Sequence, residues 1–379
     1  MKGLKNRIKL LMIVSAGVLL ASCRKDLCYD HNHAANVDLR VKYTLDWYTH
    51  WAPGISINPD WSIEWNAVIP QEPEGVRLLT YPHYEELSGQ TYNMPKSGGK
   101  IVMASGRYDL LFYNNDTEYI LFGGKGNTTV ATTRTRTRAS YSKAHPDEIT
   151  VNPPDMLFAA YLEKFYLEEM PENDLINKIQ KTVDVNLSPR VFSYVIRYEF
   201  KAGLEYVAQC RGALSGMAGS VFLSTGHTEE GAVTVLYDCR KVDYGCEAVI
   251  RSFGVPGVTL EDTKAPDEAE DATSPDLILP DLTRNGDHLF FDRNEGNKVI
   301  NITRAHPHRL TLELYLINGK EKVVEIDVTD QVNQQPRGGV IVVKGLEVTE
   351  KEGQESTGGG FDTDVGDWED DKIVDIPID

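Results

Sequence analysis

The chain has 379 residues, of which 41% are hydrophobic and 25% charged, and its formal net charge is −18 at pH 7. This acidic balance argues against nucleic acid and anionic lipid headgroups as partners, because both would repel the chain. The length suggests about two domains. The 31 glycines and 18 tyrosines, with frequent Val, Ile and Thr, favour strands joined by turns.

The first 22 residues have the layout of an export signal. Four basic residues come first: Lys2, Lys5, Arg7 and Lys9. An apolar and small-residue run over positions 10–20 follows, and small residues close the segment, as in secretory signal peptides. The run is too short for a membrane span, which needs about 20 apolar residues. Residues 1–22 are therefore predicted to be removed on export, which leaves a chain with a formal charge of about −22.

The end of this segment, Leu20-Ala21-Ser22-Cys23, resembles the lipobox of bacterial lipoproteins. The resemblance implies cleavage before Cys23 and a lipid on its sulfur; an ordinary secretory signal with a chance cysteine is the alternative. Each buried CH₂ contributes about 0.8 kcal/mol to membrane binding, and stable anchoring takes two chains. Residues 23–36 would then be a lipidated tether to the outer membrane. Arg24-Lys25-Asp26 partly resembles the surface-export signal of Bacteroidetes lipoproteins, which implies display at the cell surface.

Residues 37–184 are predicted to form a first β-sandwich domain. Apolar and polar side chains alternate from Val37 to Leu45, which is the period of a half-buried strand. Further strands are expected over 76–81, 101–103, 106–113 and 119–122. The segment 155–167 is predicted to be a short helix, with a strand as the alternative. Four tryptophans are assigned to packing, or else to a platform that stacks on sugars: Trp47, Trp51, Trp61 and Trp65.

The segment from Thr133 to Arg138 alternates threonine with arginine. It has no apolar face, so it is expected to lie outside the core. A long loop or a polar ribbon at a sheet edge are the two forms that this composition favours.

Residues 185–379 are predicted to form a second β-sandwich domain. Strands are expected over 191–200, 206–208, 220–223, 232–237, 248–250 and 340–343. The acidic stretch 261–281 is interpreted as a solvated loop. The clearest local signal is the dipeptide Asn318-Gly319 between the alternating runs 310–316 and 324–328, which predicts a hairpin with a type I′ turn. The fold class is therefore all-β, with two sandwiches that meet near residue 185.

The last eight residues follow an acidic, glycine-rich tail and are predicted to form a strand. Val374, Ile376 and Ile378 share one face of it. Pro377 suits an edge position, because it has no N–H to donate to a ladder. Such a strand can pair with an edge of its own sheet or be exchanged with a partner subunit.

Cysteine and histidine spacings give no metal site. Cys239 and Cys246 flank a hairpin-like connection and are the candidate disulfide, with free buried thiols as the alternative. Two histidine pairs are expected to be exposed and without a metal role: His31 with His33, and His306 with His308. The segment 362–367 hints at a calcium loop, but Ile373 stands where an EF-hand needs glutamate. No metal and no cofactor are predicted.

The sequence contains no catalytic motif that withstands inspection. A Gly-x-Ser-x-Gly elbow, a Walker loop and a His-Glu-x-x-His pair are all missing. The glycine-rich stretch 123–126 is not followed by a predicted helix, so it is interpreted as a turn rather than a phosphate cradle. The chain is predicted not to be an enzyme.

Several segments, taken in order, resemble the fimbrillin-related lipoproteins of Bacteroidales, the group that contains the fimbrium-anchoring subunits. They are residues 76–82, 104–116, 154–155, 213–225 and 360–368. The resemblance implies two transthyretin-like β-sandwiches and a non-enzymatic surface subunit that anchors or joins a fimbrium. In polymerising members an arginine-specific protease removes an N-terminal strand. The Arg138-Ala139 bond looks cleavable here, but it lies far beyond Cys23, which implies an unprocessed base subunit.

Two functions therefore remain open. The first is a fimbrial anchor or fimbrillin-like adhesion subunit, whose partners would be fimbrial subunits or a ligand on a host or bacterial surface. The second is a surface lipoprotein that binds glycans for a nutrient-uptake system. Neither function involves nucleic acid.

Overall fold

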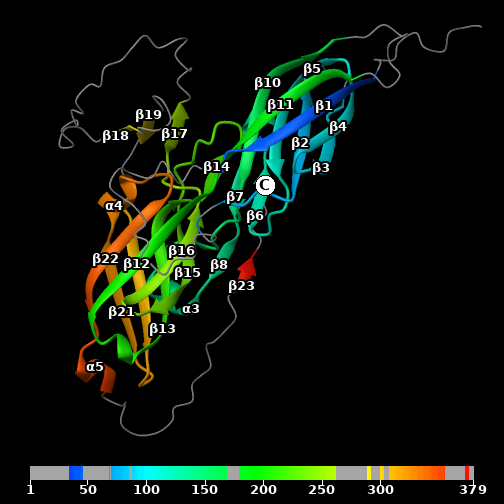
Figure 1. The fold of residues 1–379 in the computed structure, drawn as a ribbon. Coiled ribbons are helices and arrows are strands. Elements are labelled where there is room, and N and C mark those ends of the chain that lie inside the picture. The colour runs from blue at the N-terminus through cyan, green and yellow to red at the C-terminus, as the bar shows by residue number, and fades with distance from the viewer. Residues whose placement is uncertain are drawn as a thin grey trace, which may run out of the picture.

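The computed structural model describes residues 34–45, 68, 70–84, 88–168, 179–261, 288–291, 299–302, 307–354 and 372–374. These residues form mostly β structure, arranged as two curled sheets at the two ends of an elongated molecule (Figure 1). None of the helices in these ranges is long and apolar enough to cross a membrane. The all-β expectation is met at this level, as two curled sheets.

The first sheet has seven strands and almost closes into a barrel. Their order is β3 (Thr91–Pro95), β2 (Gly75–Pro82), β5 (Gly106–Asn114), β10 (Phe158–Leu167), β11 (Ile179–Pro189), β1 (Ala34–Tyr43) and β4 (Gly98–Ala104). The two edge strands approach each other where the Tyr92 hydroxyl donates a hydrogen bond to the Val102 carbonyl, at 2.6 Å. The predicted alternation in β1 is confirmed, because Val37, Leu39 and Val41 are all buried in the interior of this near-barrel.

The predicted helix over 155–167 is wrong, and the strand alternative is confirmed. Strand β10 pairs with β5, but its register shifts between Leu162 and Phe165. Lys164 has a left-handed φ of 55°, and its N–H donates to Asp109 Oδ1 at 2.9 Å. This irregularity interrupts the two-residue period of the strand. The apolar residues therefore recur at three- and four-residue intervals, which imitates a helix.

The second sheet has ten strands and curls into a half-barrel. Its main path is β21 (Glu321–Asp327), β20 (Arg309–Leu316), β13 (Val207–Ala218), β15 (Ala232–Val242), β16 (Gly245–Ser252), β12 (Phe192–Ala202) and β22 (Gly339–Glu347). A branch leaves β15 through β9 (Thr150–Val151), β8 (Thr135–Thr137) and β23 (Lys372–Val374). Alternate residues of the long strands fill the interior, among them Leu312, Tyr194 and Ile341.

Two smaller sheets accompany the large ones. One contains β14 (Ser220–Phe222), β7 (Val130–Thr133) and β6 (Ile120–Gly123), and the other contains β17 (Val258–Glu261), β19 (Val299–Ile302) and β18 (His288–Phe291). The sheet of β14, β7 and β6 lies between the two curled sheets. Its core cluster combines Leu111 and Ala159 of the near-barrel with Val221 of β14 and with Phe253, which follows β16. Strand β11 continues to Pro189, so the first sheet extends past the predicted junction at residue 185.

The described residues also include three short α-helices and two 3-10 turns. The helices are α3 (Ala139–Ala144), α4 (Thr329–Asn333) and α5 (Glu350–Gln354), and the turns are η2 (Gly126–Thr128) and η4 (Leu204–Tyr206). Helix α3 packs Tyr141 on Ala213 and Leu236, on the outer face of the half-barrel.

The predicted hairpin at Asn318-Gly319 is confirmed, but its turn type is not. Gly319 has a φ of 79°, whereas neither Ile317 nor Asn318 has a positive φ. The Gly319 N–H donates to the Leu316 carbonyl at 3.0 Å, and the Leu316 N–H donates to Lys320 at 2.8 Å. This is a three-residue loop, a type I turn closed by a left-handed glycine, rather than a two-residue type I′ turn.

Candidate functional site

Most of the residues singled out from the sequence lie outside the described ranges. These are the lipobox residues Leu20, Ala21, Ser22 and Cys23, the histidines His31, His33 and His306, the four tryptophans, the segment 362–367, and Ile376 and Ile378. Lipidation at Cys23 therefore stays a prediction. Within the described ranges, the threonine–arginine segment, residues 133–138, and the residues that follow it make a set of polar contacts to the sheet.

The segment 135–151 crosses the outer face of the half-barrel, and we call it the strap. It contains β8, α3 and β9, and it lies over β13, β15 and β20. The outer face has room for polar side chains, because the leucines at alternate positions of β20 point into the core on the other side.

Arg138 fixes the middle of the strap. Its guanidinium donates to Glu313 Oε2 at 3.3 Å, to the Gly212 carbonyl at 3.2 Å and to the Tyr237 carbonyl at 3.0 Å. Ser140 Oγ donates to the other Glu313 oxygen at 3.1 Å. Arg138 and Glu313 are each only 3% exposed. The expectation that this segment stays outside the core is therefore wrong for Arg138. Strand β8 is polar, as predicted, but it lies between β9 and β23 rather than at the edge of the sheet.

Arg309 fixes the far end of the strap. Its guanidinium donates to Glu148 and, at 3.1 Å, to the Tyr141 hydroxyl, while His145 Nε2 lies 2.8 Å from Glu325 Oε1. Burial alone would raise the pKa of Glu148, but hydrogen bonds from Thr234, Tyr141 and Arg309 outweigh it and hold that pKa below its usual value. The carboxylate is thus kept charged. Its ion pair with Arg309 of β20, together with the contact between His145 and Glu325 of β21, holds the strap to the sheet.

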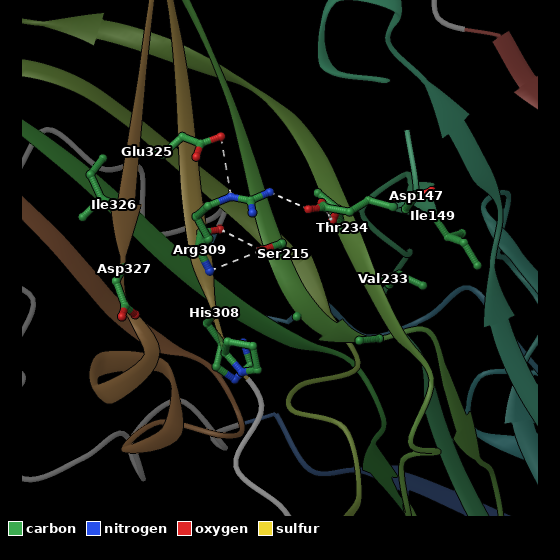
Figure 2. A pocket seen from close by; sticks show the side chains of 14 residues that line it. Asp147, Ile149, Ser215, Val233, Thr234, His308, Arg309, Glu325, Ile326 and Asp327 are labelled. Atoms are coloured by element: carbon green, nitrogen blue, oxygen red, sulfur yellow. Dashed lines mark hydrogen bonds and ion pairs between the residues drawn. The ribbon is translucent and has the colours of Figure 1, made fainter. Parts of the chain in front are cut away.

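A depression of about 650 Å³ lies beside this end of the strap (Figure 2). Asp147, Arg309, Glu325 and Asp327 give it a charged rim of both signs. Ser215 Oγ accepts a hydrogen bond from the backbone N–H of Arg309 at 3.3 Å and donates one to the backbone carbonyl of Arg309 at 3.4 Å. Both hydrogen bonds of this hydroxyl are therefore with the backbone. The depression can hydrogen-bond a polar surface, and its geometry gives no arrangement of nucleophile and base.

His308 borders the same depression and corrects a prediction. It was expected in an exposed loop, but it is 1% exposed and its Nε2 lies 3.3 Å from Asn333 Oδ1. It directly precedes β20, and its imidazole contacts α4 through Asn333. In the part of the chain that the structure describes, no group of three His, Cys, Asp or Glu side chains is arranged so that it could hold a metal ion.

The candidate C-terminal strand pairs with the strap. Lys372, Ile373 and Val374 lie opposite Thr137, Arg136 and Thr135 in antiparallel register. Strand β23 is thus an edge strand of its own chain in this structure, and Figure 1 shows it beside β8 at the side of the molecule. Exchange of the segment containing Val374 with a partner subunit stays a proposal.

Three thiols converge in the core of the half-barrel. Cys210, Cys239 and Cys246 are free in the structure. Cys210 lies directly opposite Cys239 across the β13–β15 pair, whereas the residue opposite Cys246 is Lys241. The predicted Cys239–Cys246 disulfide stays a prediction, and the register makes Cys210 the cross-strand neighbour of Cys239.

Several of these residues carry no recognisable signal in the sequence. Glu313 occupies an ordinary outward position between leucines, and Glu148 and Arg309 lie far apart along the chain. Only the stretch from Thr133 to Arg138, which has no apolar face, marked this part of the chain as unusual. Its partners could not be found without the pairing of β8, β9 and β15.

Comparison with known proteins gives a family model, a relative and solved structures. Residues 55–238 match the model of a domain of unknown function, DUF5119. Over 221 residues the chain is 24% identical to the "Putative fimbrium anchoring subunit Fim4B" of Bacteroides ovatus, a match that covers 58% of this chain and 64% of that protein. The chain is homologous to Fim4B and spans just under two thirds of its length.

A crystal structure of a "putative adhesin" from Bacteroides ovatus matches with a TM-score of 0.54 at 19% identity, over 86% of this chain and 96% of the other. The fimbrial anchor protein Mfa2 from Porphyromonas gingivalis matches with a TM-score of 0.41 at 11% identity, over 82% and 91%. The first match shows that the two-sheet fold occurs in a solved structure. These relatives are described as fimbrial and adhesive proteins, not as enzymes.

Proposed function

We propose that this chain is an outer-membrane lipoprotein, exposed at the cell surface, that anchors a fimbrium or serves as a fimbrillin-like adhesion subunit. The homology to Fim4B carries the proposal, and the fold shared with the adhesin supports it. Residues 1–22 act as the export signal and Cys23 as the lipidated residue. The two curled sheets correspond to the transthyretin-like sandwiches that the family resemblance implies.

The strap supports the assignment to an uncut base subunit. A protease specific for arginine must take the guanidinium of its target into its own pocket. The guanidinium of Arg138 is instead bound to Glu313 and to two backbone carbonyls in a buried position. Cleavage after Arg138 would require the strap to leave the sheet first. In the folded chain the strap therefore stays uncut.

The test separates the anchor from the glycan-binding alternative. Cys23→Ala removes the acyl chains that hold the protein on the membrane. If the chain links a fimbrium to the cell, both the variant and the fimbrial subunits should move into the culture fluid and co-purify there. Cys28→Ala, which alters a neighbouring cysteine outside the lipobox, is the matched control and should leave both on the cell.

Two results would contradict this function. Incorporation of a palmitate analogue into the Cys23→Ala variant would show that the lipid is elsewhere. Release of the variant alone, with fimbriae still attached to the cell, would favour the surface glycan-binding lipoprotein. In that case the released protein should be retained on a glycan column rather than with fimbrial subunits.

A further inference from the structure

The main path of the half-barrel ends at two edge strands that differ in charge. Strand β21 carries four charged residues among seven: Glu321, Lys322, Glu325 and Asp327. Strand β22 opens with five uncharged residues, Gly339-Val340-Ile341-Val342-Val343. Charges on an edge discourage the addition of another strand, whereas an uncharged, β-branched edge invites it. Strand β22 therefore needs another form of protection.

Two glutamines of the segment between these strands supply it. Gln331 Nε2 donates to the Val342 carbonyl at 3.2 Å, and the Val342 N–H donates to Gln331 Oε1 at 2.9 Å. Gln335 makes the same pair of bonds with Val340, at 2.9 Å and 2.6 Å. A side-chain amide offers the same donor and acceptor as a peptide group. Each glutamine thus replaces one residue of a neighbouring strand.

The spacing of the two glutamines fits the spacing of the edge. Four residues of helix rise about 6 Å, and two residues of strand rise about 6.6 Å. Gln331 lies in α4, and Gln335 lies two residues past its end, where the Gln334 N–H still donates to the Asp330 carbonyl and continues the helical turn. The outward-facing groups of Val340 and Val342 stand two apart on β22. The helix runs antiparallel to the strand, so both amides reach their partners together.

The surroundings hold the second amide in place. Gln335 is 4% exposed, and the Tyr194 hydroxyl donates to its backbone carbonyl at 3.1 Å. Gln335 Nε2 also donates to the Gln331 carbonyl at 3.0 Å. A Cβ at Gly339 would overlap the Gln335 side chain, so the glycine leaves the space that the amide occupies.

We infer that Gln331 and Gln335 form an edge lock, which occupies the strand-addition position of β22 and keeps the half-barrel from pairing with a second copy of this chain. The second copy is the expected occupant because the uncharged edge 339–343 is identical in both molecules. Two such edges can pair antiparallel about a two-fold axis. The inference does not depend on the fimbrial role.

The experiment compares three variants of the purified chain by hydrogen–deuterium exchange and light scattering. In the double variant Gln331→Ala and Gln335→Ala, the N–H groups of Val340 and Val342 should exchange about tenfold faster at low concentration, since each loses a hydrogen bond. At higher concentration the mass should double, and the same amides should become protected again. Gln334→Ala, an exposed neighbour, is the matched control and should behave as wild type.

A milder variant covers the case in which the double variant does not fold. Gln331→Met keeps the length of a half-buried side chain but removes its polar atoms. The Val342 N–H should then exchange faster while the Val340 N–H stays protected. Self-association should be weaker than in the double variant. Unchanged exchange at Val342 would overturn the lock. Two other outcomes would overturn the role in preventing self-pairing. One is faster exchange without any gain in mass. The other is a gain in mass while the amides of Val340 and Val342 still exchange fast.

Discussion

At the scale of single residues, the Arg138–Glu313 pair decides how the strap lies. Two charges at 3% exposure lose their hydration, and only their mutual contact and the added hydrogen bonds compensate. A buried pair of this kind adds little net stability, but it strongly disfavours any arrangement that leaves one partner alone. The pair therefore acts mainly by fixing the position of the strap on the sheet.

Replacing Arg138 with Met should lower the free energy of unfolding by about 3–5 kcal/mol, because Glu313 would be left buried without a counter-charge. Adding Glu313→Leu should restore much of the loss, although each substitution alone is harmful. Urea denaturation of the two single variants and the double variant measures this. Arg40→Met is the control, since its partner Asp38 forms an exposed pair that contributes at most about 1 kcal/mol. A double variant as unstable as the sum of the singles would show that the residues act independently.

At the scale of elements, the hairpin of β20 and β21 depends on one backbone conformation. Gly319 has a φ of 79°, and a Cβ there would meet no atom within 4 Å. Gly319→Val should therefore cost about 1–2 kcal/mol through backbone strain alone. In Gly319→Asn the new side chain enters the same open space, and asparagine adopts the left-handed region more readily than valine. This variant should therefore lose less free energy of unfolding. Equal melting temperatures for the two variants would show that conformation is not what Gly319 contributes.

Elements with an unbroken local period were predictable from the sequence, and the others were not. The alternating leucines of β20 and the alternation in β1 report directly which side is buried. In β10, the irregularity at Lys164 changed the period and concealed the strand. Arg138 looked exposed because its burial depends on Glu313, which is 175 residues away in sequence. The edge lock escaped notice for the same reason, since glutamines in and just after a short helix carry no local sign of a strand partner.

At the scale of the whole molecule, the strap connects the C-terminal strand to the half-barrel. Among the strands that the structure describes, β23 pairs with β8 alone, over three residues. Strand β8 is itself held by Arg138 and by its neighbour β9. The attachment of β23 is thus the weaker of the two, and its loss should leave both curled sheets folded.

A chain that ends at Asp371 tests what the C-terminal strand is for. Because β23 adds few hydrogen bonds, the truncated chain should melt within a few degrees of the full chain. If Val374, Ile376 and Ile378 enter a partner's sheet edge, as strand addition permits, the truncated chain should also lose its co-purification with fimbrial subunits. The matched control replaces Asp375 and Asp379 with Asn, which leaves the apolar face unchanged, and it should retain both properties. A sharp fall in melting temperature would instead assign the strand to its own domain. Normal folding with undiminished co-purification would exclude both roles, because neither the fold nor the partner would then need the strand.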